Sequence, residues 1–588
     1  MALDLKIIGG LVVDGSGQEP YRADIGISGG RIVAVGKVAD TAARTIDAQG
    51  CLVTPGFVDL HTHYDGQVTW DADLLPSAAH GITTAVMGSC GVGFAPVRPS
   101  DRDRLIKLFE GVEDIPGTAL AEGIRWRWES FEQYMDAVDF GHTMDIATQV
   151  THDALRIYAM GDRAVAGQEA TDADLKAMQG LLRSALQAGA VGFSTGRTDN
   201  HRALDGSATP ASEASDRELR TLAEAFAGLD HGVLQAVSDF DMERSPARFD
   251  AEFDLLEQWI AGAPGHGVSI SLMQRDLVPT QYQQILKRAE GLAQRGVDIR
   301  VQVAPRGIGV LIGLEATFHP FIGYPSYKAI AQLPLDERVQ IMRDPAFRSR
   351  LLAEKSEPVA GDGSPIPPLV DRLLGAIDMI AGRIFRLGDN PHYEPSVGES
   401  IRADALRRGV PTLEVLYDAL LEQNGKELLY FPIYNYMGGN LEAVREMLHH
   451  PLAIPGLGDG GAHVGTICDA SMPTFLLHYW TRDRAEGQLP LAKAVRMLTH
   501  DTAAFLGMRD RGLIQVGLKA DLNVIDHANL RLFRPRLVAD LPAGGKRLLQ
   551  DAAGYRATIV SGQLVSENGQ LTGERPGRLV RLGQGRVS

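Results

Sequence analysis

Two histidines one residue apart, His61 and His63, are the residues of this chain best suited to bind a metal ion. They close the run from Pro55 to His63, in which a short apolar segment leads into the pair. On an extended chain, residues i and i+2 point to the same side, so both imidazoles can face one point, as a divalent metal such as zinc requires. The alternative is two polar residues at a strand end. The Pro-Gly turn before the segment, and a second possible ligand set downstream, favour the metal site.

A carboxylate far along the chain, Asp459, is predicted to lie beside this pair. It follows a predicted strand at Leu452–Pro455, within the Gly-rich stretch Gly458–His463. If that strand is the eighth of a closed barrel, it neighbours the first, which carries the histidines. A carboxylate beside a metal-bound water can take its proton and pass it to a leaving group. The alternative, an aspartate that only caps a turn, is less consistent with this position.

Other candidate residues follow the remaining predicted strands. Cys90 lies in the tight turn Gly88–Gly93, where it is either a thiolate ligand or a small buried residue, and its flanking glycines favour the ligand. We predict substrate-binding roles for His152 after the third strand, Arg306 after the seventh and His463 after the eighth. The stretch Gly456–Gly461 also matches the spacing GxGxxG, but no convincing helix follows it, which argues against a dinucleotide site.

The composition is that of a soluble globular protein and argues against a nucleic-acid-binding or membrane protein. The 588 residues are 44% apolar and 22% charged, and the formal net charge is −16. This charge argues against nucleic acid or an anionic membrane as a partner. Three cysteines cannot form a disulfide framework, and the chain start lacks the features of a signal peptide, so we expect a cytoplasmic protein with a small-molecule substrate. A homo-oligomer is left open.

The order of predicted elements indicates an α/β fold, a (β/α)8 TIM-like barrel with a small β-sandwich domain formed by both termini. Both ends of the chain carry short strands, and chain ends often share one domain. We predict a composite sandwich from residues 1–56 and 508–588, a barrel over 57–507, and a lid insertion at about 305–450. The eight predicted barrel strands are Val58–His61, Thr83–Met87, Asp145–Val150, Val191–Ser194, Val233–Val237, Val268–Met273, Val297–Val303 and Leu452–Pro455.

These motifs resemble those of the amidohydrolase superfamily, and more narrowly of the N-acyl-D-amino-acid deacylases (D-aminoacylases). The run Pro55–His63 and the segment Gly517–Asp526 are similar to superfamily signatures, whereas Gly81–Gly91 and Val191–Gly196 are similar to segments of the deacylases. The resemblance implies a barrel with a β-sandwich and zinc-dependent amide hydrolysis. Carried over by motif, it implies that the metal ligands are His61, His63, Cys90 and Asp459, with Asp459 also the general acid/base.

Two positions depart from the family pattern. The family usually has a histidine at the end of the fifth strand and another at the end of the sixth. Val237 and Leu272 occupy these positions here, and a slip of one residue brings in Ser238 or Met273. Because valine and leucine cannot bind a metal, we expect one zinc ion and consider a second doubtful. The arginine loop that the family uses for the substrate carboxylate is also not evident, although Arg306, Arg275 or Arg197 could replace it.

Three functions are consistent with these residues. The leading one is hydrolysis of an amide C–N bond, most simply the deacylation of N-acyl (D-)amino acids or related acylated amines through a metal-activated hydroxide. The second keeps the site but cleaves a lactone, an ester or a cyclic amide. The third is a non-catalytic, metal-poor relative, which is disfavoured because His61, His63 and Asp459 would then occur together without a reason.

Overall fold

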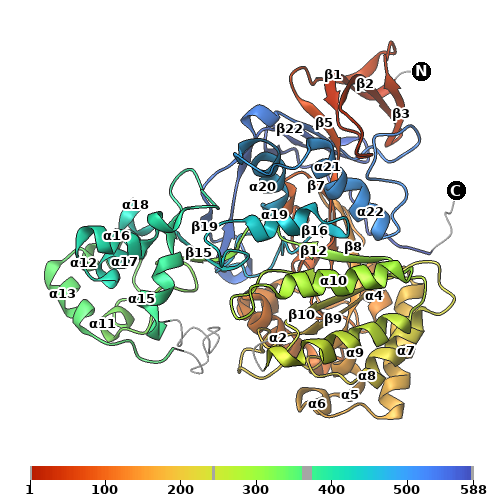
Figure 1. Cartoon of the computed structure of the whole chain (residues 1–588). Helices are drawn as coiled ribbons and strands as arrows, with labels where there is room; N and C mark the ends of the chain where they lie inside the picture. Colours follow the sequence, from red (N-terminus) through yellow and green to blue (C-terminus); the bar gives the residue numbers. More distant parts are fainter. Residues whose placement is uncertain (1–2, 242–244, 360–373, 584–588) are drawn as a thin grey trace.

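The centre of the molecule is a barrel of parallel strands. The computed structural model describes residues 3–241, 245–359 and 374–583. Within these ranges, eight parallel strands form one sheet in the order β16-β12-β11-β10-β9-β8-β7-β6 (Figure 1). A parallel bridge between Thr62 and Gly460 joins the segments that follow the two edge strands. The predicted barrel is therefore confirmed, with strands β6 (Phe57–Asp59), β7 (Ile82–Met87), β8 (Asp145–Thr151), β9 (Gly192–Arg197), β10 (Val233–Ser238), β11 (Gly267–Leu272), β12 (Ile299–Val303) and β16 (Ala453–Pro455).

Helices cover the outside of the barrel, which explains why its strands are buried on both faces. Four of them lie along one side of the barrel in Figure 1: α7 (Asp172–Gln187), α8 (Asp216–Ala223), α9 (Phe249–Ala261) and α10 (Gln281–Gln294). The first begins at a capping box between Thr171 and Asp174, so its start is fixed by local sequence. None of the described helices is both long and apolar enough to cross a membrane.

A layer of hydrogen-bonded polar side chains crosses the barrel interior. Gln235 on β10 bonds to Gln149 on β8 at 3.3 Å and to the carbonyl of Leu60 at 3.5 Å. Gln302 on β12 donates to Ser269 on β11 at 2.9 Å. These side chains are at most 2% exposed, so each must find its partner inside the protein. Through Gln302, whose Oε1 lies 2.7 Å from His61 Nδ1, these polar side chains reach the end of the first strand.

Both ends of the chain build a second sheet, as expected. Its strand order is β24-β23-β22-β17-β5-β1-β2-β3, with β4 (Ala42–Asp47) paired to β1. The N-terminal and C-terminal parts meet where β5 (Leu52–Pro55) runs antiparallel to β17 (Leu522–Ile525). The other strands are β1 (Leu3–Val12), β2 (Tyr21–Ser28), β3 (Arg31–Gly36), β22 (Tyr555–Val560), β23 (Gln563–Glu567) and β24 (Gln570–Leu571).

The exact domain bounds stay a prediction. The segment 577–582, assigned to the terminal domain by sequence, instead hydrogen-bonds to the barrel: the Gly577 N–H donates to His142 and the Val580 N–H to Ile146. Residues 1–2 and 584–588 of the predicted terminal domain lie outside the described residues.

The long insertion after β12 forms a body with its own apolar core. Its sheet has the order β13-β15-β14, from strands Ile308–Ile312, Leu429–Tyr434 and Phe385–Arg386. Helices α12 (Leu335–Met342), α13 (Pro345–Ala353), α16 (Ile401–Arg408) and α17 (Thr412–Leu420) gather to one side of the barrel (Figure 1). Residues 360–373 of the predicted lid lie outside the described part of the chain.

A buried ionic cluster connects the C-terminal part of the chain to the barrel. The carboxylate of Asp145, at the start of β8, lies 2.6 Å from Arg511 Nη1 and 2.8 Å from Lys519 Nζ. Arg511 also donates to Thr84 on β7 at 2.8 Å. Although burial acts to raise it, the two positive charges hold the pKa of Asp145 below its ordinary value. The cluster therefore depends on an ionised Asp145.

We predict that Asp145→Asn lowers the free energy of unfolding by about 3 kcal/mol, because it leaves Arg511 and Lys519 buried without this carboxylate. This loss of unfolding free energy is at the lower end of the range for broken buried ion pairs, because Asp510 and Asp521 still contact these cations. Urea denaturation followed by circular dichroism measures it.

The matched control is Glu567→Gln, which removes an ion pair with Arg44 whose side chains are 51% and 49% exposed. This substitution should cost less than about 1 kcal/mol. Equal losses for the two variants would contradict a structural role of the buried cluster.

Candidate functional site

Three predicted metal ligands converge at the carboxyl ends of the first two barrel strands. His61 and His63 follow β6, and Cys90 lies in the turn after β7. One ligand atom from each lies within 4.8 Å of the other two, and the Cys90 Sγ is 3.3 Å from His61 Nε2. All three side chains are buried. Within the described ranges, this is the group of histidine, cysteine and acidic side chains compact enough to hold one ion.

Backbone bonds fix the histidine pair. The Asp59 carboxylate accepts the N–H of His61 at 3.1 Å, directly after β6 ends. The Thr62 N–H donates to Val86 on β7 at 2.9 Å, and the His63 N–H donates to Gly460 at 2.8 Å. The extended chain thus sends both imidazoles to one side, as the spacing predicts.

The turn that carries Cys90 requires the glycine that follows it. Cys90 itself has a left-handed φ of +57°, and Gly91 has a φ of +81°. A Cβ on Gly91 would lie 2.7 Å from the backbone nitrogen of Gly196, so no larger residue fits. Burial, followed by the nearby charge of Glu113, raises the pKa of the Cys90 thiol. A metal ion that replaces the thiol proton would remove this cost.

Asp459 lies beside the two imidazoles, as the closed barrel predicts. Its Oδ1 is 3.2 Å from His61 Nε2 and 3.7 Å from His63 Nε2. This oxygen is buried without a hydrogen-bond partner in the described structure. Burial raises the pKa of the carboxyl group to about 7. The Nε2 atoms of both histidines therefore face the same point, next to an unsatisfied carboxylate oxygen.

The neutral state of His61 suits a metal ligand. Gln302 holds its Oε1 2.7 Å from His61 Nδ1, and its amide nitrogen is committed to Ser269. The Nδ1 atom therefore donates the proton, which leaves the Nε2 lone pair free toward Cys90 and Asp459. Burial lowers the pKa of His61 to about 4. Two neutral imidazoles and a cysteine sulfur form a donor set that fits zinc.

The ends of the fifth and sixth strands hold no metal ligand. Val237 and Met273 line the same cavity as the three predicted ligands. Leu272, which the sequence alignment placed at the sixth-strand position, is fully buried and is not among the residues that line the cavity. Of the two registers considered for the sixth strand, the one that brings in Met273 therefore fits the structure, because successive strand residues point to opposite faces. Because Met273 offers a thioether in place of an imidazole, a second metal ion would still lack the histidines that the family usually has at the ends of these strands.

These side chains open into a cavity of about 520 Å³. The three predicted ligands and Asp459 are among the residues that line it. Apolar residues from the long insertion, among them Phe318, Phe431 and Ile433, also line it. The size and the mixture of an apolar wall with a few convergent polar groups are typical of a small-molecule site.

Glu113 contacts two histidines of the cavity, and the sequence motifs did not predict these contacts. Glu113 ends α2 (Arg102–Glu113) and places Oε1 3.1 Å from His63 Nδ1 and Oε2 3.7 Å from His463 Nε2. His463, predicted to bind substrate, does line the cavity, as does His201. The one sequence signal for Glu113 was an acidic pair, Glu113 and Asp114, at a helix C-terminus, where the helix dipole disfavours negative charge.

The other two predicted substrate-binding residues lie away from the cavity lining. His152 is buried with both ring nitrogens bonded at 2.9 Å, to Thr195 and to Glu218. Arg306 is buried against the Tyr393 ring and donates to Asp469 at 3.0 Å. The geometry therefore does not support contact of His152 or Arg306 with a substrate, because their side chains turn away from the strand ends into the surrounding structure.

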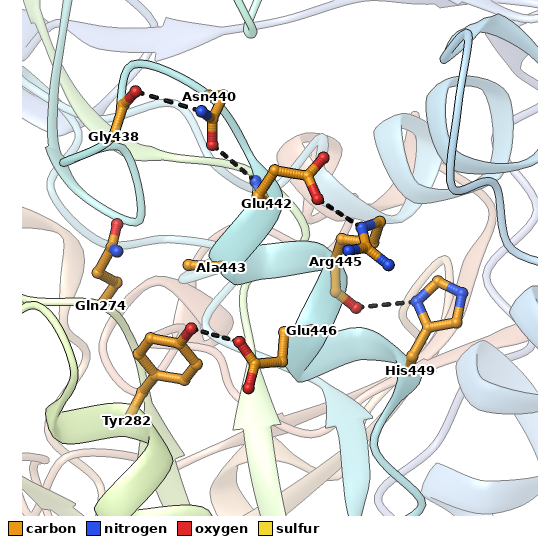
Figure 2. A pocket seen from close by; sticks show the side chains of 9 residues that line it. All are labelled: Gln274, Tyr282, Gly438, Asn440, Glu442, Ala443, Arg445, Glu446 and His449. Carbon is orange, nitrogen blue, oxygen red and sulfur yellow. Dashed lines mark hydrogen bonds and ion pairs between the residues drawn. The ribbon is translucent and has the colours of Figure 1, made fainter.

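A second cavity, of about 500 Å³, contains no comparable cluster (Figure 2). Its polar side chains pair with one another. Tyr282 donates to Glu446 at 2.5 Å, and Arg445 donates to Glu442 at 2.6 Å. No metal-ligating group converges there among the described residues. We therefore assign the candidate site to the first cavity.

The chain is similar in sequence and in structure to several known proteins. A model of the amidohydrolase family matches residues 44–566. A D-aminoacylase of Alcaligenes xylosoxydans xylosoxydans is 27% identical over 582 residues, 98% of this chain and 97% of the relative. An N-acyl-D-aspartate deacylase of the same organism is 28% identical over 389 residues, 62% of this chain and 73% of the relative. A solved D-aminoacylase structure, from work on its binuclear metal centre, matches with 25% identity and a TM-score of 0.63, covering 98% of this chain and 100% of that one.

We predict that Cys90→Ala reduces the zinc retained after dialysis from about one ion per chain to a small fraction of that, because it removes one of three converging donors. Elemental analysis of the purified protein measures this. Cys468→Ala is the matched control, since Cys468 is equally buried, at 8% against 7% exposed, but lies outside the ligand group. Equal zinc content in the two variants would contradict a ligand role for Cys90.

Proposed function

The chain belongs to the amidohydrolase family, and from this premise we propose that it is a zinc-dependent deacylase of N-acyl amino acids. Water adds to the acyl carbonyl, the C–N bond breaks, and a carboxylate and a free amine are released. The observation that carries the proposal is the convergence of His61, His63 and Cys90 next to the unpartnered carboxylate oxygen of Asp459. D-aminoacylase and N-acyl-D-aspartate deacylase relatives support the choice of an amide bond and of D-amino acids.

One zinc ion would be held by His61, His63 and Cys90, with Asp459 as a further ligand. When bound, it supplies Lewis acidity that polarises the acyl carbonyl and acidifies a water molecule. The absence of donors at Val237 and Met273 supports one ion rather than two, because neither side chain is an ordinary zinc ligand. The relative with a solved structure is described with a binuclear centre, so this chain would differ from it.

Asp459 is the proposed general acid/base. With Oδ1 facing the two imidazoles, the other carboxylate oxygen can accept a proton from the attacking water and deliver it to the leaving nitrogen. A pKa raised to about 7 by burial suits both halves of this transfer near neutral pH. The left-handed backbone of Asp459, with φ of +47°, holds the carboxylate over the two imidazoles.

Arg275 is the proposed partner of the substrate carboxylate. It lines the cavity, is 3% exposed, and donates to the Ser238 carbonyl at 2.6 Å and to Gln281 at 3.2 Å. Among the described residues, no carboxylate lies within ion-pair distance of it. Asp239 is near enough to act on its charge, but that carboxylate is bonded to Thr198 and to backbone N–H groups. A bound substrate carboxylate would neutralise the charge of Arg275.

The long insertion is the proposed cover of this cavity. Residues of its strands β13 and β15, including Val310, Phe431 and Tyr434, line the space beside the metal ligands. Their apolar surfaces would contact an acyl chain and limit the access of bulk water.

We predict that Asp459→Asn lowers kcat by about 10²–10⁴-fold, because asparagine cannot carry the transferred proton. Hydrolysis of N-acetyl-D-amino acids, measured alongside zinc content, tests this. The zinc content should remain close to wild type, since the other three ligands are intact. Unchanged turnover in a zinc-loaded Asp459→Asn protein would overturn the proposed role.

We predict that Arg275→Met raises KM about 10–100-fold for an N-acetyl-D-amino acid, because a charge-assisted hydrogen-bonded pair is lost. The same variant should change KM little for the matching N-acetyl-D-amino-acid amide, which has no carboxylate. Arg202→Met is the matched control, because Arg202 also lines the cavity but already pairs with Asp199 at 3.1 Å. Equal losses on both substrates would contradict carboxylate binding by Arg275.

A further inference from the structure

Glu113 is a buried carboxylate, and no hydrogen bond in the described structure explains its burial. Its side chain is 1% exposed, and neither oxygen has a hydrogen-bond partner in the described structure. A buried carboxylate without a partner is costly, so native proteins rarely retain one without a reason. The nearest polar atoms are two imidazole nitrogens, His63 Nδ1 at 3.1 Å and His463 Nε2 at 3.7 Å.

The contacts of Asp114, the next residue, show that the end of α2 is held in place without the Glu113 side chain. Asp114 caps α2 with a left-handed φ of +50°, and its carboxylate accepts the Thr317 hydroxyl at 3.3 Å. The backbone N–H of His463 donates to the Glu113 carbonyl, which fixes the end of α2 against the loop after β16. The position of the helix is therefore held by Asp114 and by the backbone. The Glu113 side chain remains available for another role.

The two nitrogens of His63 face different partners. Nε2 points toward Asp459 Oδ1 at 3.7 Å, on the side where His61 Nε2 also lies. Nδ1 faces Glu113 Oε1 at 3.1 Å, although the ring N–H is not aimed along this line. The edge of Phe109, also on α2, packs near the same ring, with the centroids 6.5 Å apart. The ring is thus held between a carboxylate and an aromatic side chain of one helix.

We propose that Glu113 is a positioning residue that accepts a hydrogen bond from Nδ1–H of His63 and so directs Nε2 of that ring to the metal. The two atoms already lie at hydrogen-bonding distance, 3.1 Å, so the proposed bond requires a change in the orientation of the ring rather than in the distance. Gln302 has the same relation to His61, with its Oε1 2.7 Å from Nδ1. Groups that bond the second nitrogen of a metal-bound histidine fix its tautomer and raise its basicity. This inference rests on the proposed function, because it assumes that a metal binds His63.

The two histidines would then be supported unequally. The partner of His61 is a neutral amide from the barrel strand β12. The partner of His63 is a carboxylate from α2, which lies outside the barrel. A carboxylate is the stronger acceptor, and with the metal bound its negative charge faces a cation across the imidazole. The second oxygen of Glu113 also faces His463, so one side chain links a ligand to a cavity histidine.

Zinc and cobalt binding by Glu113→Gln and Glu113→Leu tests the inference. The zinc affinity, measured by competition with a chromophoric chelator, should fall about 10–100-fold, while saturating metal still gives the wild-type stoichiometry. The visible spectrum of the Co²⁺ form should retain its thiolate band from Cys90, but the ligand-field bands should shift. An affinity within twofold of wild type for both variants would overturn the inference.

Glu218→Gln is the matched control. Glu218 is equally buried, at 1% exposed, and bonds a histidine, His152, at 2.9 Å, but it lies outside the cavity. We expect its loss to affect stability and to leave the zinc affinity unchanged. A loss of affinity in Glu218→Gln as large as in Glu113→Gln would also overturn the inference, because it would show a general effect of removing a buried glutamate.

A crystal structure of the zinc-loaded wild-type protein provides a test that needs no variant. His63 should bind zinc through Nε2 and place Nδ1 within hydrogen-bonding distance of Glu113. A His63 that binds through Nδ1 would overturn the inference and leave the proposed function intact. A wild-type protein that binds no metal would instead overturn both.

Discussion

The physical constraint on which the site depends is the burial, close together, of imidazole, thiol and carboxyl groups that each prefer a partner. His61, His63, Cys90 and Asp459 share one desolvated region, and Glu113 lies directly behind it. Burial keeps the imidazoles neutral and raises the pKa values of the thiol and the carboxyl groups. A buried charge is tolerated when a partner compensates it. A divalent cation at this point would compensate the burial of these groups.

The rest of the fold holds these groups together. The barrel brings the first and eighth strands side by side, and the bridge from Thr62 to Gly460 places the histidine pair against the loop of Asp459. The polar layer in the barrel interior reaches His61 through Gln302. Outside the barrel, α2 adds Glu113, and the long insertion supplies apolar residues. Three separate parts of the chain thus converge on one cavity.

Much of this arrangement could be predicted from sequence because it is encoded locally. Barrel strands buried on both faces read as short apolar runs, so all eight were located, with bounds that differ by a few residues. The histidine pair and the Gly-flanked Cys90 carry their geometry in their spacing. Asp459 required one further step, the closure of the barrel, which follows from the number of strands.

The missed features depend on side-chain direction and long-range contact. His152 follows a strand end as expected, yet its ring turns to Thr195 and Glu218 rather than to the cavity. Met273 rather than Leu272 faces the cavity, a difference of one residue that reverses the face of the strand. Glu113 comes from a helix outside the barrel, and no local pattern places a helix end beside His63. Such contacts are set by tertiary packing.

The central claim is that one zinc ion is bound by a cysteine thiolate together with two imidazoles, without a second ion at the fifth and sixth strands. X-ray absorption spectroscopy at the zinc edge tests this most directly. We expect one sulfur at about 2.3 Å and nitrogen or oxygen atoms at about 2.0–2.2 Å from each zinc, with no zinc–zinc distance. A zinc shell without sulfur, or a zinc–zinc distance of about 3.5–4 Å as in two-metal sites, would contradict the claim.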